Sequence, residues 1–123
     1  MPNINAALGC AQLEKLSDKL ASKRELFKRY QSAFAQVDGV SLFSEPENSQ
    51  SNYWLQTLVL DGSESENRDL ILESTNNTGI MTRPARELMN DLEPFKGFPS
   101  MDLSTAKSLL ERIINIPSSP GLV

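Results

Sequence analysis

The spacing of hydrophobic residues predicts one long helix at the start of the chain. Apolar residues recur at spacings of three, four and seven along residues 4–37, which places them on one stripe of a helix: Leu13, Leu16, Leu20, Phe27, Tyr30 and Phe34. Asn3 or Asn5 is expected to cap this helix, because an amide oxygen can accept hydrogen bonds from the free N–H groups of the first turn. Gly39 is expected to end it.

Short runs of β-branched, aliphatic and aromatic residues predict four strands. Residues 53–60 give the strongest signal, and apolar groups on both faces of this run favour a central strand. Shorter strands are expected at residues 40–43, 80–82 and 113–116.

Two further helices are expected between the strands. Ser63 and Glu66 have the spacing of a capping box, which predicts a helix from there to about residue 78, with Leu70 and Ile71 facing inward and Gly79 as its stop. Asp102 or Ser104 is expected to cap a last helix that carries Ala106, Leu109 and Leu110.

The order of these elements predicts an α+β fold, with a small and mainly antiparallel sheet covered by helices on one face. The chain of 123 residues is expected to form a single domain over residues 1–123. A helix over residues 4–37 would be roughly 50 Å long at about 1.5 Å per residue, longer than such a domain is wide. Its first turns are therefore expected to extend toward another domain or subunit.

Composition narrows the classes of function. A net charge of −4 without a dense stripe of lysine and arginine argues against nucleic-acid binding and against anionic membrane surfaces. No apolar run approaches the roughly 20 residues of a membrane span, and no signal-like segment is found. The single cysteine, Cys10, excludes an intramolecular disulfide and Cys-based zinc sites, and the absence of histidine excludes Ser-His-Asp mechanisms. We expect a cytoplasmic protein with no metal site and no catalytic residue of its own.

Two arginines form the first candidate binding motif. Arg83 and Arg86 flank Pro84 directly after a predicted strand, and planar guanidinium groups suit phosphate recognition. The residues alone favour the alternative, in which both arginines pair on the surface with Glu87, Asp91 or Glu93.

An aromatic pair forms the second candidate. Tyr53 and Trp54 stand at the start of the strongest predicted strand, where they could stack on a nucleotide base or cover the edge of a cofactor. Packing in the core is the commoner role for such a pair. Asn52 could simply form a local hydrogen bond at the strand start.

The opening of the chain resembles the start of the C-terminal domain in the DegT/DnrJ/EryC1/StrS family of sugar aminotransferases, which use pyridoxal phosphate. The match comprises Met1, Asn3, Ala6, Ala7, Gly9, Gln12 and Leu13. Thr82-Arg83-Pro84, residues 86–90, Phe95-Lys96 and residues 115–119 are similar to the members that make 4-amino sugars on nucleotide carriers. Ala85 departs from that pattern, since those members usually carry a bulky residue there.

The resemblance implies the small C-terminal domain of an enzyme with the aspartate-aminotransferase-like fold, whose large cofactor-binding domain lies elsewhere. The implied reaction transfers an amino group, with glutamate as the expected donor, to a 4-keto nucleotide sugar. The resemblance places Tyr53, Trp54, Arg83 and Arg86 at the substrate, and Asn3 at the edge of the cofactor site.

The resemblance also implies a homodimer in which the turn around Ala6 and Gly9 lies at the interface. The lysine that holds pyridoxal phosphate is expected upstream of Met1, because all six lysines lie on patterns that indicate exposure: Lys15, Lys19, Lys23, Lys28, Lys96 and Lys107. The chain alone is therefore expected to be inactive. The alternatives are a non-enzymatic module that dimerises through its long helix in a regulatory role and, more weakly, a DNA-binding regulator.

Overall fold

A computed structural model describes residues 2–123, so Met1 of the family-like opening lies outside the described residues. Four antiparallel strands form one sheet in the order β1-β2-β4-β3. The strands are β1 (Val40–Leu42), β2 (Gln56–Leu60), β3 (Arg83–Pro84) and β4 (Ile113–Ile116). The strand predicted at residues 53–60 is therefore confirmed as interior, although it begins only at Gln56, and β4 has the predicted bounds.

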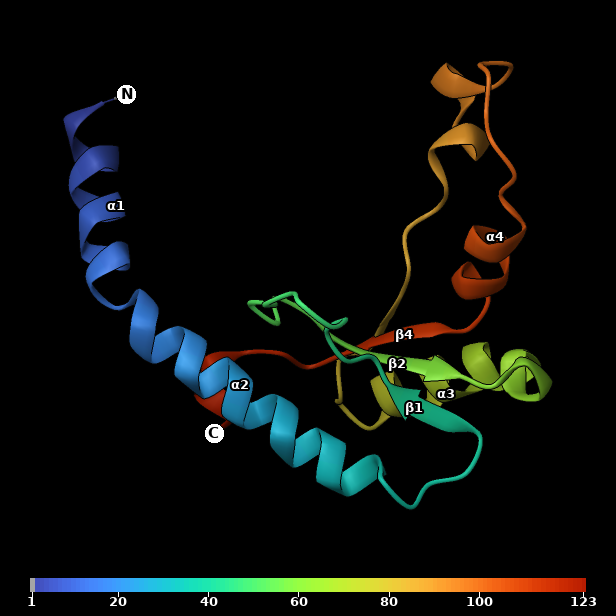
Figure 1. The fold of residues 1–123 in the computed structure, drawn as a ribbon, viewed down its shortest axis with the longest axis horizontal. Helices are drawn as coiled ribbons and strands as arrows, with labels where there is room; N and C mark the ends of the chain where they lie inside the picture. The colour runs from blue at the N-terminus through green and yellow to red at the C-terminus, as the bar shows by residue number, and fades with distance from the viewer. Residues whose placement is uncertain (1) are drawn as a thin grey trace.

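Four α-helices accompany this sheet, with short 3-10 turns between some of the elements (Figure 1). They are α1 (Asn3–Glu14), α2 (Leu16–Phe34), α3 (Arg68–Asn77) and α4 (Ser104–Leu110). In Figure 1, α1 extends away from the sheet at one end of the molecule, and the segment from β3 to α4 extends away at the other. No helix in residues 2–123 has the length and apolar character that a bilayer crossing requires.

The core lies on one face of the sheet, between the strands and two helices. Leu58, Leu60, Ile114 and Ile116 are its buried strand residues. Aromatic residues of α2 and aliphatic residues of α3 pack against this same cluster: Tyr30, Phe34, Ile71 and Leu72. The predicted α+β class, with helices on one face of a small antiparallel sheet, is therefore confirmed.

The other face of the sheet is not covered by these helices. Along β2 and β4, buried residues alternate with half-buried ones, as expected of strands with a single covered face. Thr57 and Val59 of β2 and Ile113 and Asn115 of β4 point away from the core. The open face is therefore available for a ligand or for further polypeptide.

The prediction of one continuous helix over residues 4–37 is wrong. The chain leaves helical geometry at Lys15, with φ −100° and ψ 4°, and a second helix begins at Leu16. The break carries neither proline nor glycine. No residue of α1 is buried, whereas α2 buries Leu26 and Phe27, so tertiary packing holds only the second helix against the domain.

Capping by Asn3 or Asn5 is also not observed. Pro2 is the N-cap residue of α1, and no side chain provides a capping hydrogen bond. The backbone carbonyl of Pro2 instead accepts from the N–H groups of Asn5 and Ala6, at 3.0 and 3.1 Å. The side chain of Asn3 is exposed on the first turn.

The capping box at Ser63 and Glu66 is replaced by a 3-10 helix over Gly62–Asn67, and α3 begins only at Arg68. Leu70, expected to face inward, is exposed, whereas Ile71 faces the core as predicted and Leu72 joins it there. At the last helix, Asp102 accepts a hydrogen bond from the N–H of Ser104 at 3.2 Å, although Leu103 occupies the N-cap position.

No strand forms at residues 80–82, where one was expected, and β3 lies directly after them, at Arg83–Pro84. The N–H of Ile80 donates to the carbonyl of Thr75 at 2.9 Å, which extends the helix end past Gly79. Thr82 is buried, and its Oγ1 lies 2.6 Å from Thr75 Oγ1. Because these bonds hold residues 80–82 against α3, pairing with β4 begins at Arg83, opposite Asn115.

Two glycines with positive φ form a matched pair for a stability test. Gly39 (φ +79°) ends the turn before β1, and Gly79 (φ +84°) ends α3. A Cβ at Gly39 would lie 2.9 Å from Glu64 Cγ, whereas at Gly79 no atom lies within 4 Å. We expect Gly39→Ala and Gly79→Ala each to cost about 1–2 kcal/mol from backbone strain, with a larger loss at Gly39.

Urea unfolding measures the loss of stability in both variants. The extra loss at Gly39 should disappear when Glu64 is replaced by alanine, because the crowded side chain is then gone. Equal losses at the two glycines in the presence of Glu64 would contradict the crowding.

Candidate functional site

A hollow of about 710 Å³ lies on the open face of the sheet. Its residues come from the turn before β2, from β2 and β4, and from β3 with the residues after it. They are Trp54, Leu55, Thr57, Arg83, Pro84, Ala85, Arg86, Ile113 and Asn115. The hollow therefore brings together three of the four predicted substrate residues, Trp54, Arg83 and Arg86, from segments about 30 residues apart.

Polar residues that the strand register aligns across the sheet form the floor of this hollow. Thr57, Asn115 and Arg83 are directly paired across β2, β4 and β3. The hydroxyl of Thr57 donates to Asn115 Oδ1 at 3.0 Å, and Asn115 Nδ2 donates to the carbonyl of Pro84 at 3.3 Å. Thr57 and Asn115 were not predicted as site residues. Their alternation with buried neighbours was the available signal, but only the strand order shows which residues they meet.

Arg83 and Arg86 are both exposed and line the same hollow. Within residues 2–123 neither guanidinium is ion-paired, so the predicted pairing with Glu87, Asp91 or Glu93 is not observed. Glu93 pairs instead with Lys96. The Arg83 guanidinium lies 3.4 Å from the sulfur of Met81. Two positive groups beside one hollow make it suitable for an anion such as a phosphate.

Trp54 presents a large aromatic surface at the edge of this hollow, since 72% of the residue is exposed. The backbone N–H of Trp54 donates to Asn52 Oδ1 at 3.0 Å, so the expected local hydrogen bond of Asn52 is confirmed. An exposed indole ring next to two guanidinium groups can stack on a planar base while the arginines bind attached phosphates.

Tyr53 occupies a different environment from its neighbour. The residue is 6% exposed, and its ring stacks on Phe27 of α2 with the ring centres 4.2 Å apart. The guanidinium of Arg24 lies 5.5 Å from the ring centre. Tyr53 does not line the hollow of Trp54 and the arginines, so in this structure its ring packs against α2.

Charged residues of α2 anchor the loop that leads to Trp54. Arg24 Nη2 donates to the carbonyl of Ser51 at 2.5 Å, and Arg24 Nη1 lies 3.4 Å from Glu45 Oε1. Glu45 Oε2 accepts from the N–H of Ser51 at 2.5 Å. The Ser51 hydroxyl in turn accepts from the N–H of Tyr53 at 2.9 Å. Together these contacts fix residues 45–53 in front of β2.

Acid should loosen this loop. The hydrogen bond from the Ser51 N–H, followed by the contact with Arg24, holds the pKa of Glu45 below its ordinary value of 4.5. A carboxyl group whose pKa is lower in the folded state stabilises the fold above its unfolded pKa, and this contribution is lost as the pH falls through the folded pKa. We expect Trp54 fluorescence to change below about pH 4.5 while the helical circular dichroism persists.

The matched control is Glu45→Gln, in which this acid transition should be absent. A transition of the same size in Glu45→Gln would assign it to other carboxyl groups.

The lysines differ from the expectation of uniform exposure. Lys19 and Lys23 are half-buried, and burial lowers the pKa of the Lys23 amine. The Nζ of Lys19 donates to Gln12 Oε1, and that of Lys23 donates to backbone carbonyls. Neither lines the hollow, and Asn3 lies on the exposed first turn of α1. The hollow therefore contains neither a lysine nor Asn3 within residues 2–123.

Among residues 2–123, no group of three or more histidine, cysteine, aspartate or glutamate residues is placed to hold a metal ion. The single cysteine, Cys10, is exposed on α1.

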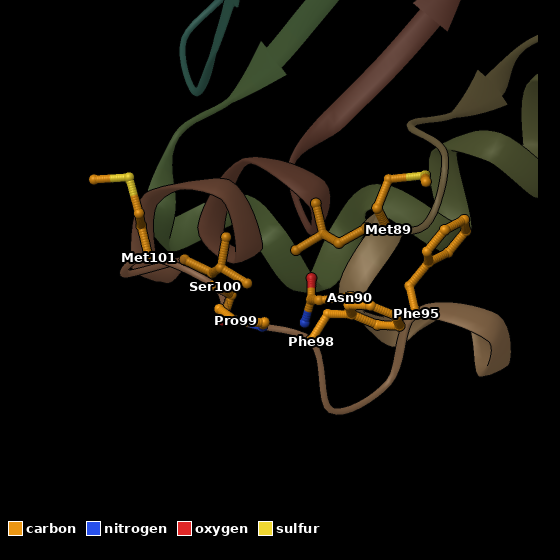
Figure 2. A pocket seen from close by; sticks show the side chains of 9 residues that line it. Met89, Asn90, Phe95, Phe98, Pro99, Ser100 and Met101 are labelled. Carbon is orange, nitrogen blue, oxygen red and sulfur yellow. The ribbon is translucent and has the colours of Figure 1, made fainter.

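A second hollow, of about 590 Å³, lies in the segment between β3 and α4. In Figure 2, Met101 and Phe95 lie at opposite ends of the lining side chains, with Asn90 and Phe98 between them. The lining is almost entirely apolar: Leu88, Met89, Asn90, Phe95, Phe98, Pro99, Ser100, Met101 and Leu103. It offers no charged group that could orient a polar substrate, so we place the candidate site at the hollow of Trp54, Arg83 and Arg86.

Comparison with known proteins identifies the family. The model of the DegT/DnrJ/EryC1/StrS aminotransferase family matches residues 1–123. GDP-perosamine synthase of Vibrio cholerae is 29% identical over 123 residues, which cover 99% of this chain and 33% of that enzyme. The chain thus spans about one third of the length of the curated relatives it matches.

Solved structures share the fold. DesI, solved in the presence of its TDP-sugar product, superposes with a TM-score of 0.84 at 23% identity over 94% of this chain and 30% of that one. Streptococcus pneumoniae Spr1654 in its pyridoxamine phosphate (PMP) form gives a TM-score of 0.85 at 24% identity over 100% and 31%. The predicted fold is therefore confirmed, since part of each of these sugar aminotransferases shares it. With its whole length matched by the family model, the chain belongs to the DegT/DnrJ/EryC1/StrS aminotransferase family.

Proposed function

We propose that the chain is the small C-terminal domain of a pyridoxal-phosphate-dependent aminotransferase that aminates a 4-keto nucleotide sugar. Its substrate is bound in part at the hollow on the open face of the sheet. The observation that carries this proposal is the meeting of Trp54, Arg83 and Arg86 at one hollow, with both guanidinium groups free of ion pairs within residues 2–123.

The chemistry of the hollow suits a nucleotide sugar. A nucleoside diphosphate offers a planar base for Trp54 and negatively charged oxygens for Arg83 and Arg86. Thr57 and Asn115 add a hydroxyl and an amide on the floor, where sugar hydroxyls could exchange hydrogen bonds with them. A relative that makes GDP-perosamine and a structural neighbour solved with a TDP-sugar product support this class of substrate.

The cofactor belongs to the part of the full-length protein outside this chain. The PMP form of a structural neighbour supports pyridoxal phosphate as the coenzyme of the full-length enzyme. When bound, the coenzyme supplies the electron sink for amino-group transfer. This chain supplies no lysine for the Schiff base in our proposal, so the isolated chain is inactive, and Asn3 reaches the cofactor edge only in the complete enzyme.

The assembly and the pathway complete the proposal. The enzyme is a cytoplasmic homodimer, takes its amino group from glutamate, and serves the synthesis of surface polysaccharides. The interface includes the small-residue turn of α1, where Gly9 has no atom within 4 Å of its Cβ position in the isolated chain. Light scattering of the full-length protein tests the dimer, and a monomer at high concentration would contradict it.

A direct assay tests the activity. The full-length protein, incubated with glutamate and a 4-keto nucleotide sugar, should release 2-oxoglutarate and an amino sugar nucleotide. Failure with several carriers, together with no measurable affinity for GDP or dTDP, would overturn the proposal. A dimer without bound cofactor would then favour the non-enzymatic regulatory module.

A further inference from the structure

The backbone that presents Trp54 adopts an uncommon conformation. Tyr53 has φ +46°, in the left-handed region that bulky residues rarely occupy. Residues in such conformations carry backbone strain and persist only where the surrounding structure holds them. Some group must therefore hold the turn at Tyr53 and Trp54 immediately before β2 begins at Gln56.

Lys23 of α2 makes the bonds that hold this turn. Its Nζ donates to the carbonyl of Tyr53 at 3.2 Å, to that of Trp54 at 3.1 Å and to that of Ser118 at 2.7 Å. An ammonium group carries three donors and no acceptor, so three converging carbonyl oxygens use its full capacity. The three acceptors belong to two segments that are more than 60 residues apart in the sequence.

The residues around Lys23 tighten the same junction. The carbonyl of Lys23 accepts from Gln56 Nε2 at 3.2 Å, and Gln56 is buried at the first position of β2. The N–H of Gln56 donates to Ser118 Oγ at 3.2 Å. The start of β2, the Trp54 turn and the segment after β4 thus all meet around Lys23: its side chain binds the turn and Ser118, and its backbone carbonyl binds Gln56.

We propose that Lys23 is a positioning residue for the candidate site, which fixes the Trp54 turn so that the indole ring stands at the edge of the hollow. Lys23 does not line that hollow and acts only through the backbone of Tyr53 and Trp54. The proposal goes beyond the function proposed above in assigning a role to a lysine outside the hollow. It rests on that function only where it concerns substrate affinity.

The first test observes the turn directly. Trp54 is the only tryptophan of the chain, so fluorescence anisotropy of the 123-residue protein reports the mobility of this turn. Lys23→Met should lower the anisotropy at unchanged helical circular dichroism, whereas Lys28→Met, at an exposed position of the same helix, should leave it unchanged. If Lys23→Met does not fold, Lys23→Gln, which is too short to reach three acceptors, replaces it with the same expected loss. Wild-type anisotropy in a folded Lys23 variant would overturn the proposal.

The second test separates the proposal from the proposed function. In the full-length enzyme, Lys23→Met should raise the KM for the nucleotide sugar by about two- to tenfold at unchanged kcat, because Trp54 must then be ordered during binding. If anisotropy falls but neither Lys23→Met nor Trp54→Ala changes the KM, the substrate role of Trp54 is wrong and the positioning role stands. If Trp54→Ala raises the KM while Lys23→Met changes neither the anisotropy nor the KM, the positioning role is wrong and the proposed function stands.

Discussion

Replacing Arg83 by glutamine in the full-length enzyme should raise the KM for the nucleotide sugar by about ten- to a hundredfold, and Arg86→Gln should act similarly. A hydrogen bond to a charged group contributes about 1.5–3 kcal/mol, and each 1.4 kcal/mol corresponds to a factor of ten. Because the phosphate charge is present in both substrate and transition state, kcat should change little. Steady-state kinetics with varied nucleotide sugar measures both parameters.

Two controls define this result. Arg29→Gln removes an exposed arginine of α2 that pairs with Glu25, and it should leave the KM unchanged. The free energy of unfolding of both site variants should lie within about 0.5 kcal/mol of the wild-type value, because neither arginine is buried or ion-paired within residues 2–123. An unchanged KM in the Arg83 and Arg86 double variant would remove both arginines from the substrate site.

Replacing Ile114 by alanine should destabilise the domain by about 2–5 kcal/mol, the range for truncating a fully buried aliphatic side chain. Ile114 is 0% exposed, and its strand partner Leu58 belongs to the same core cluster. Since single domains are stable by only about 5–15 kcal/mol, this loss removes a large share of the total. Urea denaturation monitored by circular dichroism measures it.

The neighbouring residue provides the matched control. Ile113 has the same side chain on the same strand but faces the open side and is half-buried. Ile113→Ala should therefore cost clearly less than Ile114→Ala. Equal losses would mean that the open face is covered as well, and would contradict its assignment as an accessible site.

Local patterns predicted the elements that bury their apolar residues in the regular way. The runs at 40–43 and 113–116 became strands at nearly the expected bounds, because β-branched and aliphatic residues on a covered sheet face obey a simple period. The first helix was predicted too long, since its spacing continues through Lys15 but the contacts that hold α2 do not extend to α1. Strand β3 was displaced because Thr75 and Asn76 bind residues 80–82 at the end of α3.

Two charged residues of α2 show the limit of reading a helix face from sequence. Lys23 and Arg24 have the spacing of an exposed charged face, yet both are half-buried and bind backbone carbonyls of the loop before β2. A lysine that binds three carbonyls and a lysine in water have the same local sequence. The difference depends on a loop about 30 residues away and on Ser118 after β4, so helical periodicity cannot reveal it.

The sequence by itself determined the α+β class, the central position of β2 and the family, because these depend on local periodicity and on motifs within short segments. It also selected Trp54, Arg83 and Arg86 as residues of interest. Only the tertiary structure decided that these three meet at one hollow, that Tyr53 packs on Phe27 instead, and that Thr57 and Asn115 form the floor. Which residues come together is set by strand order and register. These depend on contacts between distant segments, so the sequence of one segment alone cannot predict them.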